Sequence, residues 1–223
     1  MNLKKITLTL AAILLLPIST PAKSDNIVIP QNFPDKYTKE YILDVMPLYK
    51  SVSKEPVIMA ALDMLIGTTG EFSRNAILGN NLSQRPMKVE FKNLSEIDSK
   101  YANFDALGWK KGKQLYIYIN AKHKDAPPGA IAALLSHEAL HQDEYNSVAE
   151  ETYAWTMEAA VWCEILRIYP KSDENLSSLV KRENNLKRMF EKGNYSDKYI
   201  KKEIRVNPGY KNLPQTSPGF EDI

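Results

Sequence analysis

The hydrophobic residues follow two different periods, which divide the chain into a helical start, a short β region and a helical second half. Over 35–52, apolar residues recur at spacings of three or four, which predicts an amphipathic helix. The residues on this face are Tyr41, Val45, Leu48 and Val52. Over 57–66 the chain is more uniformly apolar. Pro56 before it and Gly67 after it predict the two ends of a second, buried helix.

The middle of the chain has the alternating pattern of β-strands. Apolar and polar residues alternate over 87–91, which predicts a first strand, and a second strand is expected within 101–109. The clearest strand is 115–119, where β-branched and aromatic residues dominate between turn residues. The three segments together predict a small, twisted, mostly antiparallel sheet.

Helical patterns return after the sheet and continue almost to the end of the chain. Helices are predicted over 130–142, 147–169 and 176–191, and the Pro-rich segment 207–223 is predicted to be an irregular tail. We therefore expect an α+β fold, with residues 35–206 forming a single domain of ordinary size.

The first 22 residues have the order of a secretory signal peptide. Lys4 and Lys5 precede a short apolar run, and small residues suitable for cleavage end at Ala22. The run is too short to cross a bilayer about 30 Å thick, so an uncleaved membrane anchor is the weaker alternative. The sequence predicts export to the periplasm or beyond, without stable membrane insertion, and residues 23–34 as a linker. A lipoprotein is excluded, because the only cysteine is Cys163.

Removal of the leader makes the chain neutral. The full chain carries 29 basic and 27 acidic residues, and residues 1–22 contain two lysines and no acidic residue, so 27 − 27 leaves zero. A neutral chain offers no electrostatic basis for binding nucleic acid or an anionic membrane surface. One cysteine cannot form an internal disulfide, so stability must come from the core and from any bound metal.

The strongest chemical signal is an H-E-x-x-H motif at residues 137–141. Four residues along an α-helix advance the chain by about 400°, so His137 and His141 project from one face roughly 6 Å apart. Two imidazoles in that arrangement can bind one tetrahedral zinc ion. Glu138 would flank the ion without binding it, where it can accept a proton from the attacking water. The alternative is an accidental motif, with two ordinary histidines on a solvated helix face.

A catalytic zinc ion needs a third protein ligand, and three residues are candidates. His123 lies in a lysine-flanked loop and is expected to be exposed, whereas Glu150 and Glu151 begin the next predicted helix. Ser147 and Glu150 fit a capping box, in which the Glu150 side chain would reach back to the Ser147 N–H. That task would leave Glu151 free to bind the metal. Glu151 also shares a helix face with Trp155, Glu158 and Trp162.

These residues resemble the gluzincin metallopeptidases, the thermolysin-like branch of the zincins. That family combines H-E-x-x-H with a later glutamate ligand in an E-x-x-[AS]-x context, which is similar to the segment 151–155 with alanine at Ala154. The resemblance implies a zincin-like fold, zinc as the single cofactor and Glu151 as the third ligand. It also implies a peptide or protein substrate aligned along an edge strand.

The sequence departs from the family at two points. Trp155 stands where many members carry an acidic residue that orients a zinc histidine, so that role is open. Glu158 is a candidate for it, although polar surface is the stronger expectation. The family also uses a downstream side chain to stabilise the oxyanion, and no motif selects one tyrosine. The tyrosines in that region are Tyr145, Tyr195, Tyr199 and Tyr210.

The residues together predict an exported zinc metallopeptidase with Glu138 as general base. Two alternatives stay open: an exported protein that holds zinc without catalysis, and an interaction module with an accidental motif. A closed structural site would need a fourth protein ligand, for which His123 and Glu150 are the candidates. Neither the substrate nor the oligomeric state is predicted.

Overall fold

The computed structural model describes residues 29, 32–79 and 85–221. The predicted signal peptide and most of the predicted linker lie outside these residues. Within the described chain, no helix is both long enough and apolar enough to span a bilayer.

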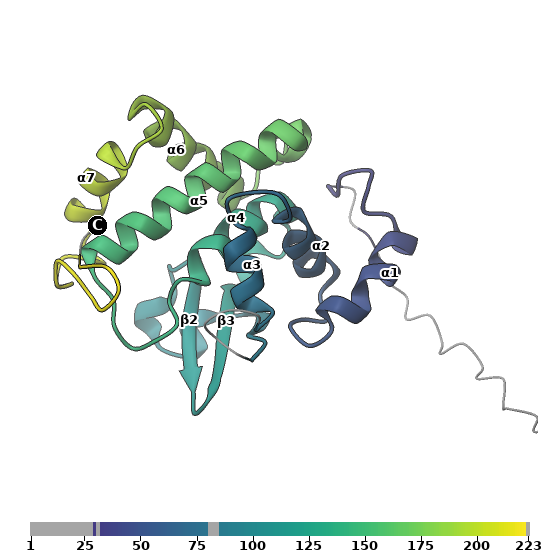
Figure 1. Cartoon of the computed structure of the whole chain (residues 1–223), viewed down its shortest axis with the longest axis horizontal. Helices are drawn as coiled ribbons and strands as arrows, with labels where there is room; N and C mark the ends of the chain where they lie inside the picture. Colours follow the sequence, from purple (N-terminus) through teal and green to yellow (C-terminus); the bar gives the residue numbers. More distant parts are fainter. Residues whose placement is uncertain (1–28, 30–31, 80–84, 222–223) are drawn as a thin grey trace, which may run out of the picture.

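The described part of the chain has seven α-helices and a small sheet that lies to one side of them (Figure 1). The first three precede the sheet, and the other four follow it. They are α1 Lys39–Tyr49, α2 Pro56–Met64, α3 Glu71–Ile77, α4 Pro128–Glu138, α5 Val148–Ile168, α6 Ser178–Lys192 and α7 Lys198–Val206. Four short 3₁₀ turns join them: η1 Leu94–Glu96, η2 Ser99–Tyr101, η3 Ala121–His123 and η4 Pro170–Asp173. The α+β class is confirmed.

The sheet has three strands in the order β1-β3-β2, namely β1 Lys88–Lys92, β3 Gln114–Asn120 and β2 Ala106–Lys111. β2 and β3 form an antiparallel hairpin, whereas β1 pairs with β3 in parallel. The prediction of a mostly antiparallel sheet is therefore wrong, because the sheet is mixed. The physical reason is the connection after β1, where two 3₁₀ turns carry the chain to the far edge before it returns.

Local side chains explain several element ends. Thr38 caps α1 by accepting a hydrogen bond from the Tyr41 N–H, so this helix starts four residues later than predicted. Asp98 likewise caps the 3₁₀ turn η2 by accepting from the Lys100 N–H, so the predicted second strand begins only at Ala106. Ser147 caps α5, and this helix agrees with the prediction over 147–169.

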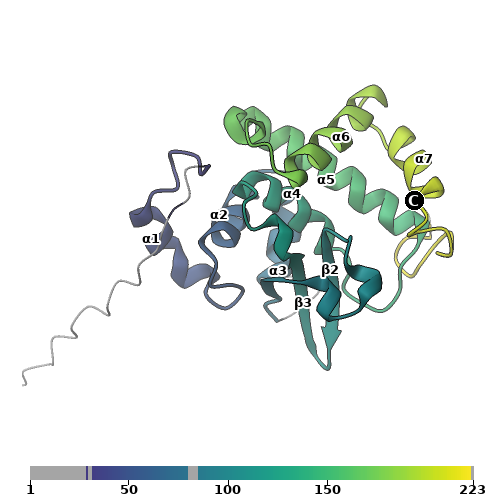
Figure 2. The same cartoon turned by 180° about the vertical axis from the view of Figure 1, so that it is seen from behind.

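Helix α4 is the centre of the molecule. All of its residues are buried, and it packs between α2 on one side and α5 on the other. The crossing is close at Gly129, where an added Cβ would lie 2.9 Å from the Ile165 Cγ2 atom. Helix α5 crosses the whole domain, with α6 and α7 packed along it (Figures 1 and 2). Helices α4 and α5 thus belong to the packed centre of the fold.

A second, smaller apolar cluster joins the C-terminal helices to α5. Its buried members are Val148, Ala159, Leu186, Phe190, Ile200 and Ile204. Tyr210 and Leu213 from the predicted tail pack against it. Among its described residues, the tail contains turns and no helix or strand, yet it lies against the start of α5 (Figure 1). At the other end of the chain, Ile29 and Phe33 of the predicted linker pack against the main core.

Candidate metal centre

The three predicted ligands converge where α4 ends and α5 begins. The Nε2 atoms of His137 and His141 lie 3.2 Å apart. The Glu151 carboxylate reaches both, with Oε2 at 3.8 Å from His137 Nε2 and Oε1 at 3.7 Å from His141 Nε2. Two nitrogens bound to one tetrahedral zinc ion at about 2.0–2.1 Å would be roughly 3.3 Å apart. On the described residues, this is the one group of three such side chains that could hold a metal ion.

The helix that carries the motif ends earlier than predicted, at Glu138 instead of 142. Beyond it the chain turns more tightly, because the Leu140 N–H donates to the His137 carbonyl at 3.0 Å and the His141 N–H to the Glu138 carbonyl at 3.3 Å. This 3₁₀-like turn still leaves both rings on one side, with centroids 5.1 Å apart. The prediction that both histidines share a face is confirmed.

The Glu151 carboxylate is buried, and only one of its two oxygens has a hydrogen-bond donor among the described residues. Its Oε1 atom accepts a hydrogen bond from Asn146 Nδ2 at 2.6 Å. Its Oε2 atom is buried without a hydrogen-bond partner among the described residues. A buried carboxylate oxygen without a donor is costly, and a cation at this point would remove the cost. The donor set therefore fits a metal ion.

Each histidine is oriented through its other ring nitrogen by a buried glutamate. Glu158 lies 3.0 Å from His137 Nδ1, and Glu150 lies 2.9 Å from His141 Nδ1. An ionised carboxylate can only accept, so each Nδ1 carries a proton, and Nε2 is the ring nitrogen that faces the metal position. Carboxylate–histidine pairs of this kind fix the ring orientation in metal sites.

Two predictions about these glutamates are wrong. Glu158 is not polar surface: it is fully buried, and it binds Arg182 as well as His137. Glu150 does not complete a capping box, because its side chain points to His141, although Ser147 does cap the helix. The Ser147 N–H donates instead to Asn146 Oδ1. Arg182 is 24 residues beyond Glu158, on α6, so no local pattern could reveal the pairing.

Arg182 lies at the centre of a group of three carboxylates behind His137. Its guanidinium contacts Glu158 through two nitrogens and also contacts Asp105 and Glu183. Burial alone would raise the pKa of Glu158, but the charge of Arg182 and the hydrogen bond to His137 lower it to about 2. Burial and the charge of Glu158 hold the pKa of Glu183 well above its usual range. Glu158 therefore takes the charge, and Glu183 keeps its proton.

Glu138 lies beside the ligands and not among them. Its Oε1 atom is 4.0 Å from His137 Nε2, and the side chain is almost fully buried. Burial raises the pKa of Glu138, and the charges of Glu151 and Glu158 add to the rise, while the two histidines oppose it. A carboxylate in such a dry site binds a proton more readily than one in water, which suits a proton carrier near neutral pH.

The acidic neighbours of His141 stabilise the protonated form of its ring. Burial would lower its pKa, but the hydrogen bond to Glu150 and the charges of Glu151 and Glu138 raise it to about 9. A metal ion must therefore displace a proton from this ring at neutral pH.

His123 plays no part in the metal group, and the prediction that it is exposed is wrong. The ring is 1% exposed, and its Nε2 atom lies 2.7 Å from Asp105 Oδ1. It closes the 3₁₀ turn after β3 and ties this turn to the start of β2. The cause is tertiary: Asp105 lies 18 residues earlier, so the lysine-flanked sequence suggested a solvated loop.

An edge strand passes directly beside the metal group. β2 is an outer strand of the sheet, and a Cβ added at Gly108 would lie 3.3 Å from both Cβ and the carbonyl oxygen of His141. Glycine thus permits this close approach. Lys110 of the same strand pairs with Glu144 in the loop after the motif, at 3.1 Å.

Of the four tyrosines downstream of the motif, Tyr210 is linked to the metal group through Trp155 and through the charges of Glu151 and Glu138. Its ring packs edge-on against Trp155, at 5.9 Å between centroids. Burial raises the pKa of its hydroxyl, and the charges of Glu151 and Glu138 contribute. Tyr145 and Tyr195 are mostly exposed, and Tyr199 packs under Lys192.

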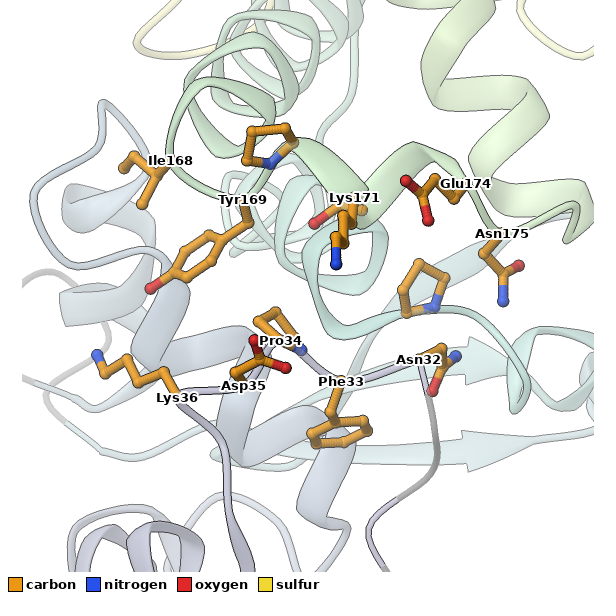
Figure 3. Close-up of a pocket in the computed structure, with 13 residues that line it drawn as sticks. Asn32, Phe33, Pro34, Asp35, Lys36, Ile168, Tyr169, Lys171, Glu174 and Asn175 are labelled. Carbon is orange, nitrogen blue, oxygen red and sulfur yellow. The ribbon is translucent and has the colours of Figure 1, made fainter.

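One cavity lies at the other end of α5. It has a volume of about 830 Å³ and is lined by the segment 32–36 and by residues around the end of α5, including Tyr169 and Lys171 (Figure 3). Glu151 and Ile168 stand 17 residues apart on α5, which corresponds to roughly 25 Å of helix. The cavity is therefore remote from the metal group.

Comparison of the chain with protein-family models, with curated proteins and with solved structures finds no match. The resemblance to the gluzincins accordingly rests on the motif residues between 137 and 155.

Proposed function

We propose that this chain is an exported zinc-dependent peptidase with a zincin-like fold. His137, His141 and Glu151 hold one zinc ion, and Glu138 is the general base. The observation that carries the proposal is the buried Glu138 carboxylate next to three convergent ligands. The export part rests on residues 1–22, which lie outside the described chain.

Each residue has a separate task in this proposal. A bound zinc ion would supply Lewis acidity, which polarises a peptide carbonyl and makes water a better nucleophile. Glu138 takes the proton from the attacking water and passes it to the leaving amine. Glu158 and Glu150 hold the two imidazoles in the ligating orientation. An extended peptide would pair with the outer edge of β2, where Gly108 brings the strand against His141.

The geometry favours an open catalytic site over a closed structural one. A closed site needs a fourth protein ligand, and His123 and Glu150 were the two candidates. His123 is bonded to Asp105, and both carboxylate oxygens of Glu150 are engaged, by His141 and by Ser217. Neither is available to the metal. The fourth position would thus be left to water or substrate.

Glu138→Gln separates the peptidase from a protein that only holds zinc. The change keeps size and hydrogen bonding but removes basicity, so zinc content and melting temperature should stay nearly unchanged. Hydrolysis of a mixed peptide library should fall by about 10²–10⁴-fold. Glu144→Gln is the matched control, since Glu144 is exposed in the adjacent loop and should retain activity.

The outcomes distinguish the alternatives. If the wild type and Glu138→Gln are equally inert and both bind zinc, the non-catalytic alternative replaces the proposal. If neither binds zinc, the motif is accidental. Wild type treated with a chelator should match the activity of Glu138→Gln.

A further inference from the structure

The end of the chain returns to the metal centre. After α7, residues 207–221 run back to the first turn of α5, where the chain end lies in both views (Figures 1 and 2). The N–H groups of Val148 and Ala149 donate to the carbonyls of Pro214 and Gln215, at 2.9 and 3.0 Å. The first N–H groups of a helix have no partner within it, so this segment supplies the missing acceptors.

One side chain of the segment enters the centre. Ser217 is 7% exposed, whereas Thr216 and Pro218 on either side are exposed. Its hydroxyl donates to Glu150 Oε2 at 2.8 Å and lies 3.0 Å from the Ser147 hydroxyl. Phe220 anchors the segment further along by packing on Tyr153, at 5.9 Å between ring centroids.

Ser217 is therefore two contacts from a predicted ligand. Glu150 accepts from Ser217 with one oxygen and faces His141 Nδ1 with the other, at 2.9 Å. The Glu150 carboxylate is 3% exposed, so water has little access to replace a lost donor. Without the Ser217 hydroxyl, Oε2 loses its donor and the carboxylate is freer to rotate away from His141.

We propose that residues 214–220 are a functional part of the metal centre, with Ser217 as a positioning residue that acts through Glu150 on His141. This inference rests on the proposed zinc site. A chain that ended before Pro214 would keep all three ligands and Glu138, yet it would bind the metal more weakly. Docking of the segment and binding of the metal strengthen each other.

Coupling of this kind is reciprocal, which provides a test on the unmodified protein. If docking raises metal affinity by some factor, the metal must favour docking by the same factor. Zinc should therefore slow hydrogen exchange at the amides of Val148 and Ala149, which the segment covers. Amides of α2, such as that of Leu62, are remote from the segment and serve as the internal reference.

The variant test compares Ser217→Ala with Thr216→Ala. Zinc affinity is measured by competition with a chromophoric chelator, and melting temperature is measured in excess chelator. Ser217→Ala should lower zinc affinity by about tenfold, the lower end of what outer contacts of metal ligands contribute. Thr216→Ala should bind zinc like the wild type. Ser217→Thr retains a hydroxyl and should recover part of the affinity.

Two results would overturn the inference. One is Ser217→Ala with unchanged zinc affinity and a lower melting temperature in chelator, which would make Ser217 a purely structural residue. The other is wild-type exchange at Val148 and Ala149 that zinc does not alter. A wild type without zinc affinity would instead overturn the proposed function itself, so the two failures are distinguishable.

Discussion

Two buried polar clusters in this protein differ in how their acceptors are satisfied. In the first, at the junction of α1 and α2, the Asp63 carboxylate receives four donors. Oδ2 accepts from Lys36, Tyr37 and Tyr41 at 2.9 to 3.0 Å, and Oδ1 faces the Tyr49 hydroxyl at 3.4 Å. Arg74 in turn donates to that hydroxyl at 3.0 Å. Donors and acceptors balance, so this cluster needs no ligand.

In the second cluster, at the junction of α4 and α5, one buried acceptor lacks a donor within the described chain. The Nε2 atoms of the two histidines and the carboxylates of Glu138 and Glu151 face a common point. Glu151 Oε2 has no donor among the described residues. Burial of such a set is unfavourable unless a cation is added. The balance of donors and acceptors, rather than burial or charge alone, therefore distinguishes a structural polar cluster from a metal site.

The largest expected effect comes from Glu151→Ala. This change removes a ligand and also removes the unsatisfied oxygen, so it should abolish zinc binding without destabilising the metal-free fold. At a free zinc concentration about 1,000-fold above its dissociation constant, the wild type should gain roughly 4 kcal/mol of stability, and the variant should gain none. Metal analysis after dialysis and thermal melts with zinc or chelator measure both quantities.

The same comparison shows how this prediction could fail. If Glu151→Ala retains one zinc ion per chain, Glu151 is not the third ligand. If the variant is several kcal/mol less stable than the wild type in chelator, Glu151 resembles Asp63 and its role is structural.

The parts of the fold that the sequence predicts are those with local signals. Helix α5 is bounded by the Ser147 cap and by Pro170, and β3 is a dense run of β-branched and aromatic residues between turns. The parallel pairing of β1 with β3 was missed, because strand order depends on a crossover that leaves no periodic signal. Helix α7 was missed as well, in a nine-residue segment with four basic side chains and a narrow apolar face.

In the candidate site, too, the residues with local sequence signals were predicted and those from distant segments were not. The ligands follow from the spacing of His137, His141 and Glu151 along two adjacent helices, and the structure brings them together. The side chains that orient them come from distant segments: Arg182 from α6 and Ser217 from the tail. A single sequence contains no information on such pairings, so Glu158 was expected at the surface.

The second largest effect is expected at the balanced cluster. Asp63→Ala removes the carboxylate that accepts hydrogen bonds from the Tyr37 and Tyr49 hydroxyls. Both tyrosine side chains are almost fully buried, so water has little access to replace the carboxylate. The loss should cost roughly 2–4 kcal/mol of unfolding free energy, since each unsatisfied buried group costs about 1–3 kcal/mol. Zinc content should stay at the wild-type value. Chemical denaturation in chelator and metal analysis test this, and a variant that loses zinc but not stability would reverse the assignment of the two clusters.

The smallest effect at pH 5 is expected behind His137, where an excess of acceptors is offset by a proton instead of a metal. Arg182 contacts Asp105, Glu158 and Glu183, and Lys122 is a second cation beside Asp105. The pKa of Glu183 is raised well above its usual range, by burial and by the charge of Glu158, so this side chain is neutral in the folded protein. Glu183→Gln reproduces the neutral form. It should change the unfolding free energy by less than about 1 kcal/mol at pH 5.

The pH dependence gives this last prediction its sign. In the unfolded wild type, Glu183 releases its proton above its ordinary pKa of about 4.3, while the folded protein retains it. Folding of the wild type therefore takes up a proton above that pH, and stability falls as pH rises towards the folded pKa. The stability of Glu183→Gln does not fall in this way, because glutamine does not titrate. In denaturant titrations from pH 5 to pH 8, the unfolding free energy of the variant should therefore rise relative to that of the wild type. If the unfolding free energy of the variant instead falls relative to the wild type as pH rises, Glu183 is ionised in the folded protein. Arg182 and Lys122 would then have to balance three ionised carboxylates.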